Sequence, residues 1–189
     1  MSERRIEVDA STLLCLPSEE DAKELFRVVD ANRSYLREWL PWLDLHTSVE
    51  ASLGFVRACS ERERTLGAFT GLIWYEGELS GVAGFNSIDR MNRSGQIGYW
   101  LARAVQGRGI MTACCRALID YGFDADHGLD LHRIAIGVAP ENHKSRAIPE
   151  RLGFREEGRV RDAEWLYDHF VDHVLYGLLR SEWQAAEPG

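Results

Sequence analysis

The spacing of apolar residues predicts one short strand and two helices in the first third of the chain. Residues 11–16 are mostly apolar and are expected to form the strand. Ser18 can cap the helix that follows, in which apolar residues recur every three or four positions at Ala22, Leu25, Phe26 and Val29. A second helix is expected over residues 48–64, after an aromatic stretch that a proline interrupts.

The middle of the chain changes to patterns that are typical of strands. Residues 68–75 and 79–85 are predicted to form two strands, with Glu76 and Gly77 as the turn between them. A third strand is expected over residues 96–101. Three short strands joined by tight turns indicate an antiparallel meander.

The last part of the chain alternates helices with strands. The expected elements are a helix over residues 109–123, a strand over 133–138, a helix over 144–152 that ends at Gly153, and extended chain from Phe154. Further on, Val171, His173 and Leu175 alternate as one face of a late strand. This order predicts a mixed α/β domain, and the small polar residues 184–189 are expected to be a frayed tail.

Composition narrows the classes of function. The chain has 189 residues and a net charge of −8, with 30 acidic and 22 basic residues, which argues against nucleic-acid binding because phosphates require a surplus of Lys and Arg. No apolar run approaches the roughly 20 residues of a membrane span, and the first residues show no apolar signal segment. We therefore expect a cytoplasmic protein without membrane contact. Two of its four cysteines, Cys114 and Cys115, are expected to be buried free thiols.

One segment carries the strongest chemical signal. A strand ending at Leu101 runs into a turn with Gly107 and Gly109, and the turn opens a helix. Glycines let a ligand approach the backbone, and the first amides of a helix attract anions such as a pyrophosphate. A plain strand-to-helix turn is the alternative. A dinucleotide-binding G-x-G-x-x-G loop is disfavoured, because Thr112 holds the third glycine position.

The same segment resembles a known family. Gln106, Gly107, Arg108 and Gly109 are similar to the acyl-CoA-binding motif Q/R-x-x-G-x-G/A of the GNAT acetyltransferases, with Met111 in place of the small last residue. Further motifs resemble the RimJ/RimL branch of ribosomal-protein N-acetyltransferases, in this order: Gly84-Phe85-Asn86, Gly98-Tyr99-Trp100-Leu101, Asn142–Ala147, Glu150–Phe154 and Arg161–Trp165. The likeness covers roughly residues 11–180.

The resemblance implies a fold and a cofactor. The fold is the GNAT α/β fold, a mixed and mostly antiparallel sheet of about seven strands flanked by helices, in a domain over residues 11–180 with a tail at 181–189. Acetyl-CoA is the implied co-substrate, with no metal and no acyl-enzyme. The residues implied to bind it are Tyr99, Trp100, Leu101, Gln106, Gly107, Arg108, Gly109, Ile110, Met111 and Asn142.

Direct transfer to an amine requires a proton acceptor and a proton donor. By resemblance, Ser145 is the candidate donor to the leaving thiolate and Glu164 the candidate base. Asn142 and Ser145 are three residues apart at a helix start, where either could instead be only a cap. Glu164 could be one of many solvated carboxylates, and Asp168 is a weaker rival for the base.

Three residues are implied to line the acceptor groove: Trp39, Trp42 and Asn86. For the two tryptophans, packing in the core or under the helix is the alternative. His169 and His173 have a spacing that suits zinc on a helix, but their segment alternates like a strand, so a metal site is disfavoured.

The acceptor is predicted to be a protein or peptide N-terminus. An α-amine has a pKa near 7.7–8 and a lysine near 10.4, so the lysine needs about 3.5 kcal/mol more to be deprotonated. The alternatives are an acetyltransferase for a small-molecule amine and a CoA-binding regulatory module without turnover. The resemblance also makes a homodimer an expectation.

Overall fold

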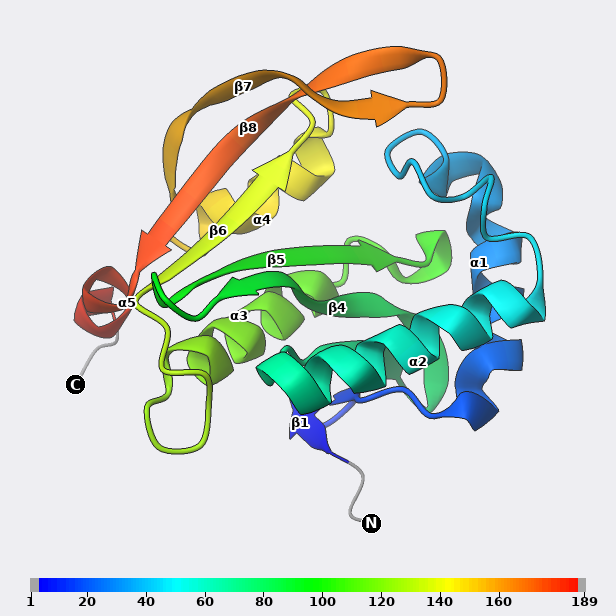
Figure 1. Cartoon of the computed structure of the whole chain (residues 1–189), viewed down its shortest axis with the longest axis horizontal. Helices are drawn as coiled ribbons and strands as arrows, with labels where there is room; N and C mark the ends of the chain where they lie inside the picture. Colours follow the sequence, from blue (N-terminus) through cyan, green and yellow to red (C-terminus); the bar gives the residue numbers. More distant parts are fainter. Residues whose placement is uncertain (1–3, 187–189) are drawn as a thin grey trace. The chain divides into compact units, whose positions relative to one another are not determined.

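The computed structural model describes residues 4–186, which form eight strands and five α-helices (Figure 1). The strands are β1 (Arg5–Glu7), β2 (Thr12–Cys15), β3 (Thr70–Tyr75), β4 (Glu78–Asp89), β5 (Ser94–Leu101), β6 (Arg133–Val138), β7 (Arg155–Leu166) and β8 (His169–Leu179). The α-helices are α1 (Ala22–Leu36), α2 (Val49–Leu66), α3 (Ile110–Phe123), α4 (His143–Arg151) and α5 (Arg180–Ala186). Short 3-10 helices lie at Glu19–Asp21 and Arg103–Val105.

The strands follow the order β1-β2-β3-β4-β5-β6-β8-β7. β5 pairs with β6 in parallel, whereas the pairs β1–β2, β2–β3, β3–β4, β6–β8 and β7–β8 are antiparallel. The prediction of a mixed, mostly antiparallel sheet with helices is confirmed. The sheet has one strand more than expected, because the three residues of β1 are too few to show an apolar pattern.

The chain groups into two compact units. The first comprises the residues up to Gly84 together with Tyr99–Ala117, and the second comprises Phe85–Gly98 together with the residues from Leu118 onward. β4, β5 and α3 contribute residues to both units.

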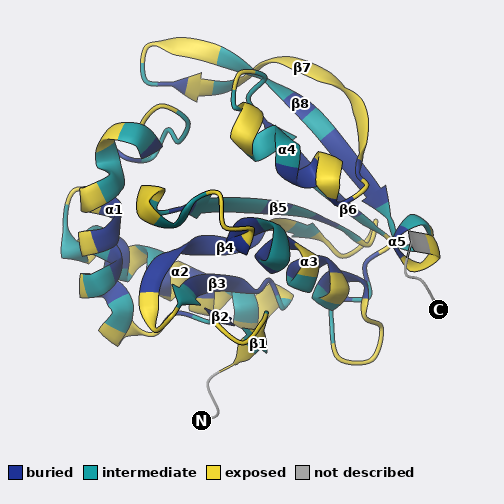
Figure 2. Cartoon of the chain, turned by 180° about the vertical axis from the view of Figure 1, so that it is seen from behind, coloured by how far each residue is buried: buried dark blue, intermediate teal, exposed yellow. Residues whose placement is uncertain are grey.

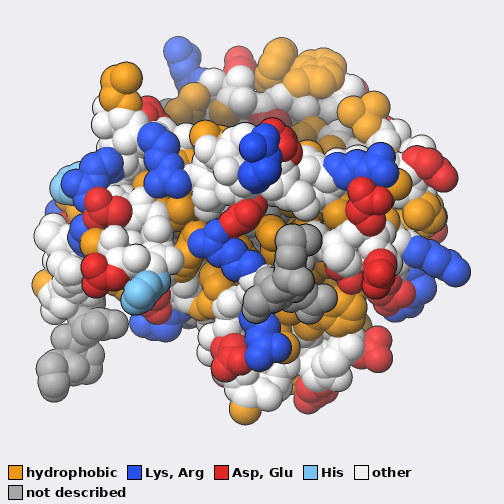
Figure 3. Space-filling model, turned by 60° about the horizontal axis from the view of Figure 1, so that its bottom comes forward, with side chains coloured by type: hydrophobic (Ala, Val, Ile, Leu, Met, Phe, Trp, Pro, Cys, Tyr) orange, Lys and Arg blue, Asp and Glu red, His pale blue; other side chains and the backbone are white. Residues whose placement is uncertain are grey.

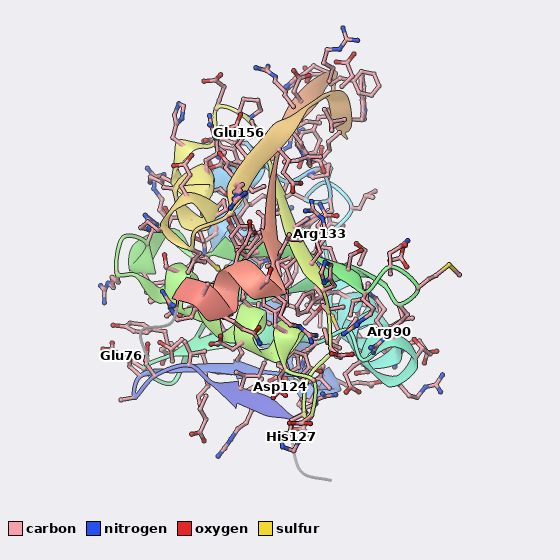
Figure 4. The ribbon with its side chains drawn as sticks, turned by 90° about the vertical axis from the view of Figure 1, so that its left-hand side faces the viewer. Glu76, Arg90, Asp124, His127, Arg133 and Glu156 are labelled. Atoms are coloured by element: carbon pink, nitrogen blue, oxygen red, sulfur yellow. The ribbon has the colours of Figure 1, made fainter. Side chains whose placement is uncertain are left out.

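In the first unit, β2, β3 and β4 form an antiparallel meander, and α1 packs against α2. The predicted turn after β3 forms at Glu76, which is labelled in Figure 4, and Gly77. Both residues have positive φ angles, 52° and 82°. The predicted helix start at Ser48 is present, because the Ser48 hydroxyl accepts the Ala51 N–H at 3.3 Å. Ser18 instead precedes the 3-10 helix that leads into α1, and its backbone N–H donates to the Asp21 carboxylate at 2.7 Å.

In the second unit, β6, β8 and β7 run side by side, with α4 against them (Figure 1). The Tyr176 hydroxyl on β8 joins the two, because it accepts from Arg146 at 2.9 Å and donates to Glu150 at 3.0 Å. Alternation along β8 then sends even-numbered side chains toward α4 and odd-numbered ones to the opposite face.

Of residues 184–189, which were predicted to be a frayed tail, 184–186 belong to a helix and 187–189 lie outside the described residues. Residues 180–186 form α5, and the Trp183 indole is buried and donates to Asp120 at 2.7 Å. A second local contact closes the loop after α3, where Asp124 accepts the backbone N–H groups of Asp126 and His127 (Figure 4).

Burial differs strongly between strands (Figure 2). β3 is mostly buried, whereas β7 is exposed along almost its whole length, as expected for a strand at the end of the order. The prediction of buried free thiols is confirmed at Cys114 and Cys115, and burial raises the pKa of Cys114 to about 12. Within residues 4–186, no helix combines the length and apolar character that a bilayer crossing needs.

Candidate active site

The predicted strand, loop and helix are present in the first unit. β5 ends at Leu101, and α3 begins at Ile110 after two glycines with left-handed backbone, Gly107 at φ 78° and Gly109 at φ 81°. A Cβ added at either glycine would meet no atom within 4 Å. The backbone conformation therefore requires glycine here, and the space beside the loop is open.

The first turn of α3 presents backbone amides beside this loop. The first helical hydrogen bond runs from the Ala113 N–H to the Gly109 carbonyl at 3.0 Å, so the preceding amides of the first turn have no partner within the helix. The side chains of Ile110 and Met111 are buried. Met111, which stands where the family has a small residue, is thus accommodated in the core rather than beside the loop. The arrangement suits a pyrophosphate.

Two residues of α1 hold the chain between β5 and the loop. The Tyr35 hydroxyl donates to the Leu101 carbonyl, which also accepts from the Gln106 side chain at 3.2 Å. The Asn32 side chain accepts the Arg103 N–H at 2.9 Å. Burial raises the pKa of Tyr35 to about 12, so the phenol stays a neutral donor.

Sequence reasoning missed both of these α1 residues. They lie 66 and 71 positions before their partners in the chain. The available signal was two polar groups three residues apart, which share one face of a helix.

Charge near the loop comes from Arg108, which is exposed. Its guanidinium carbon lies 5.8 Å from the centre of the Tyr75 ring. This contact orients a cation beside the two glycines. Over the face drawn in Figure 3, basic side chains stand next to acidic ones rather than in a patch of one sign.

In the second unit, Asn142 and Ser145 meet at the start of α4. The Asn142 side-chain oxygen accepts the Ser145 N–H at 3.1 Å, so Asn142 caps the helix. The capping alternative therefore holds for Asn142, although its amide nitrogen is a further donor. Ser145 is half-buried.

Glu164, the candidate base, lies on β7 opposite Val171 of β8. Its carboxylate is 3.5 Å from the Nε2 atom of His173, and its side chain is 30% exposed. The rival Asp168 is 88% exposed and contacts His169 beside it at 2.7 Å. Glu164 is therefore the more sheltered carboxylate and has a partner from another strand.

The three predicted groove residues lie in different settings. The amide of Asn86 lies against Gly98, the residue before Tyr99, where any added Cβ would overlap it. Trp39 and Trp42 are half-buried in the segment between α1 and α2. Arg33 supports this segment by donating to the carbonyls of residues 43 and 46 at 2.6 and 2.7 Å.

His169 and His173 both lie on β8, as the alternation predicted. Each faces its own carboxylate, Asp168 and Glu164 respectively. Within the part of the chain that the structure describes, no three His, Cys, Asp or Glu side chains gather as a metal site would require.

Comparison with known proteins decides the family. The acetyltransferase (GNAT) domain family matches residues 12–155, most of the chain. The chain belongs to this family. The predictions of the family and of an N-acetyltransferase are thereby confirmed.

Individual relatives agree with this assignment over nearly the full length. This acetyltransferase is 37% identical to the putative ribosomal N-acetyltransferase YdaF of Bacillus subtilis, over 87% of this chain and 89% of the relative. It is 33% identical to the ribosomal-protein-serine acetyltransferase of Escherichia coli, over 92% and 96% of the two chains.

A solved structure shows the same similarity. The RimL ribosomal L7/L12 α-N-protein acetyltransferase, in complex with coenzyme A, superposes with a TM-score of 0.89 at 29% identity, covering 95% of this chain and 99% of that one. The predicted likeness to the RimJ/RimL branch is confirmed.

Proposed function

We propose that this acetyltransferase transfers an acetyl group from acetyl-CoA to the N-terminal α-amine of a protein or peptide. The observation that carries the proposal is the left-handed loop at Gly107 and Gly109, which opens directly into α3. Its exposed backbone and the first amides of the helix suit the pyrophosphate of CoA. The remaining predicted contacts, on the strand Tyr99–Leu101 and at Asn142, belong to the same proposal.

The proposed chemistry is direct transfer. Glu164 accepts a proton from the ammonium form of the substrate, and the neutral amine attacks the thioester carbonyl. The carbon–sulfur bond of the tetrahedral intermediate then breaks, and Ser145 gives the departing thiolate a proton. The amine nitrogen releases its second proton to solvent. Glu164 then returns its proton to solvent and Ser145 regains one from solvent, so the products are the amide, free CoA thiol and one proton.

An α-amine is the preferred acceptor for two reasons. The relatives described above are named for ribosomal proteins, and one of them for α-N-acetylation. An α-amine is also closer to neutral at pH 7 than a lysine side chain by about 2.5 pKa units, so a single carboxylate suffices as base. The domain limits of residues 11–180, a homodimer and a cytoplasmic location are further parts of the proposal.

The test is an acetylation assay with peptides that carry a free N-terminus and an internal lysine. Each peptide is matched by a copy with a blocked N-terminus, and spermidine and free lysine are included as small amines. We expect release of CoA thiol with the free N-termini and none with the blocked copies. Turnover of spermidine or lysine alone would make this a small-amine acetyltransferase. Binding of acetyl-CoA without turnover of any amine would make it a regulatory module.

A further inference from the structure

β7 contains a bulge that determines where Glu164 lies. Val160 pairs with His173 and Glu164 pairs with Val171, so the β7 segment between these pairs is two residues longer than the β8 segment. Asp172 holds the bulge, because its carboxylate accepts the Asp162 N–H at 2.8 Å and the Arg159 guanidinium at 2.6 Å. Asp162 itself has a left-handed φ of 50°.

The register places two ionisable side chains on one face of the sheet. Residues directly opposite each other in an antiparallel pair share a face, so Glu164 lies on the face of Val171 and, two residues along β8, of His173. The two are diagonal neighbours. Their side chains are 30% and 22% exposed, with 3.5 Å between the carboxylate and Nε2. This is the face opposite to that of Tyr176, which contacts α4.

The other edge of the His173 ring is also constrained. A Cβ placed on Gly137 of β6 would lie 3.4 Å from the His173 Nδ1 atom and 3.3 Å from the Gln96 side-chain nitrogen. Gly137 therefore leaves room for a side chain from each neighbouring strand. The imidazole therefore lies with Nδ1 beside Gly137 of β6 and Nε2 toward Glu164.

From this geometry we infer that His173 is a positioning residue for Glu164. With its Nε2 atom 3.5 Å from one carboxylate oxygen, the imidazole fixes the rotamer of Glu164 and leaves the second oxygen for the substrate ammonium. The proton moves from the ammonium to that second oxygen. The inference rests on the proposed function, in which Glu164 is the base.

Two near-isosteric variants separate positioning from packing. The amide nitrogen of Gln can occupy the place of Nε2, whereas that of Asn reaches only the place of Nδ1. We expect His173→Asn and His173→Ala to lower kcat by about 10- to 100-fold, as a misplaced reacting group does. His173→Gln should retain most of the activity. Affinity for acetyl-CoA should stay within a few-fold in all three variants.

A double-mutant cycle with Glu164→Gln tests whether the two residues act together. Each change is measured in both backgrounds, with peptide kcat and KM and with the melting temperature as a check of folding. We expect His173→Asn to have little effect once Glu164 is Gln. His169→Gln is the matched control, because His169 also lies on β8 and contacts a carboxylate, that of Asp168, but at an exposed position. The activity of this variant should match that of the wild type.

The possible failures are distinct. Equal activity of the Asn and Gln variants, or an effect of His173→Asn that persists in full in the Glu164→Gln background, overturns the inference while the proposed function stands. Wild-type kcat in Glu164→Gln overturns it too, because no base is left to position. A wild-type enzyme that acetylates no peptide N-terminus overturns both.

Discussion

Replacing Gly109 by Ala separates the backbone requirement of the loop from its role in binding. Gly109 has a φ of 81°, and an added Cβ would meet nothing within 4 Å. The loss of stability therefore comes from the left-handed conformation, which costs an L-residue about 1–2 kcal/mol. For a chain of this size that lowers the melting temperature by about 2–8 °C.

Gly77 provides a matched control. It has a φ of 82° in the turn after β3, and there too an added Cβ meets no atom within 4 Å. Gly77→Ala should therefore lower the melting temperature by a similar amount. It should leave the binding of acetyl-CoA unchanged.

The difference between the two variants appears when acetyl-CoA is added. A ligand at 100 times its dissociation constant adds about 2.7 kcal/mol of stability, or about 5–10 °C here. We expect Gly109→Ala to weaken binding at least 10-fold, since the new methyl group stands where the backbone amides should meet the pyrophosphate. At the same ligand concentration its thermal shift should then be about half that of Gly77→Ala.

The assay is a thermal melt of each variant over a series of acetyl-CoA concentrations, with the dissociation constant confirmed by calorimetry. Gly109→Asp extends the series, because its charge opposes the pyrophosphate, and it should show no shift. Equal shifts in the two alanine variants would refute the reasoning and make the loop a structural turn. The absence of any shift in the wild type would refute acetyl-CoA binding itself.

Four further outcomes are expected from the site and its supports. Ser145→Ala should lower kcat by about 10²-fold with acetyl-CoA affinity almost unchanged. If steady-state kinetics give the wild-type kcat, Ser145 has only a structural role. Glu164→Gln should lower kcat/KM most at low pH and recover by about pH 9 on a peptide α-amine, which is then neutral without help; a pH-independent loss would indicate charge binding instead. Tyr35→Phe should raise the KM for acetyl-CoA by about 2- to 10-fold, the effect of one lost hydrogen bond to Leu101, and a lower kcat at unchanged KM would contradict this. Burial lowers the pKa of His46. The folded state therefore has its full stability above the unfolded pKa near 6.5 and loses this contribution as the pH falls through the lower folded pKa. Between pH 7.5 and 5.5, the melting temperature of His46→Gln should decline less than that of the wild type.

Local sequence pattern determined most of the secondary structure. The β6 strand at residues 133–138 and the turn at Glu76 and Gly77 were predicted correctly, because alternation and turn chemistry act within a few residues. The glycine loop before α3 was predicted for the same reason. Its left-handed backbone is a property of Gly107 and Gly109 themselves.

Contacts between distant segments came only with the tertiary structure. Nothing near Tyr35 in the chain indicates that its hydroxyl donates to Leu101, 66 residues further on. A frayed tail was predicted from Gln184 because the residues there are few and polar. Residues 184–186 instead continue α5, in which the Trp183 indole donates to Asp120 on α3.

The candidate base shows where sequence reasoning ends. The motif at Arg161–Trp165 indicated Glu164, but a bulge of two residues leaves the alternation along β7 intact and so cannot be seen in the pattern of side chains. The structure has the bulge because Asp172 can bind both the Asp162 amide and Arg159. That cross-strand contact selects the register of the two strands, and the register places Glu164 next to His173. Strand pairing is an interaction between separate segments, so no local sequence preference specifies it.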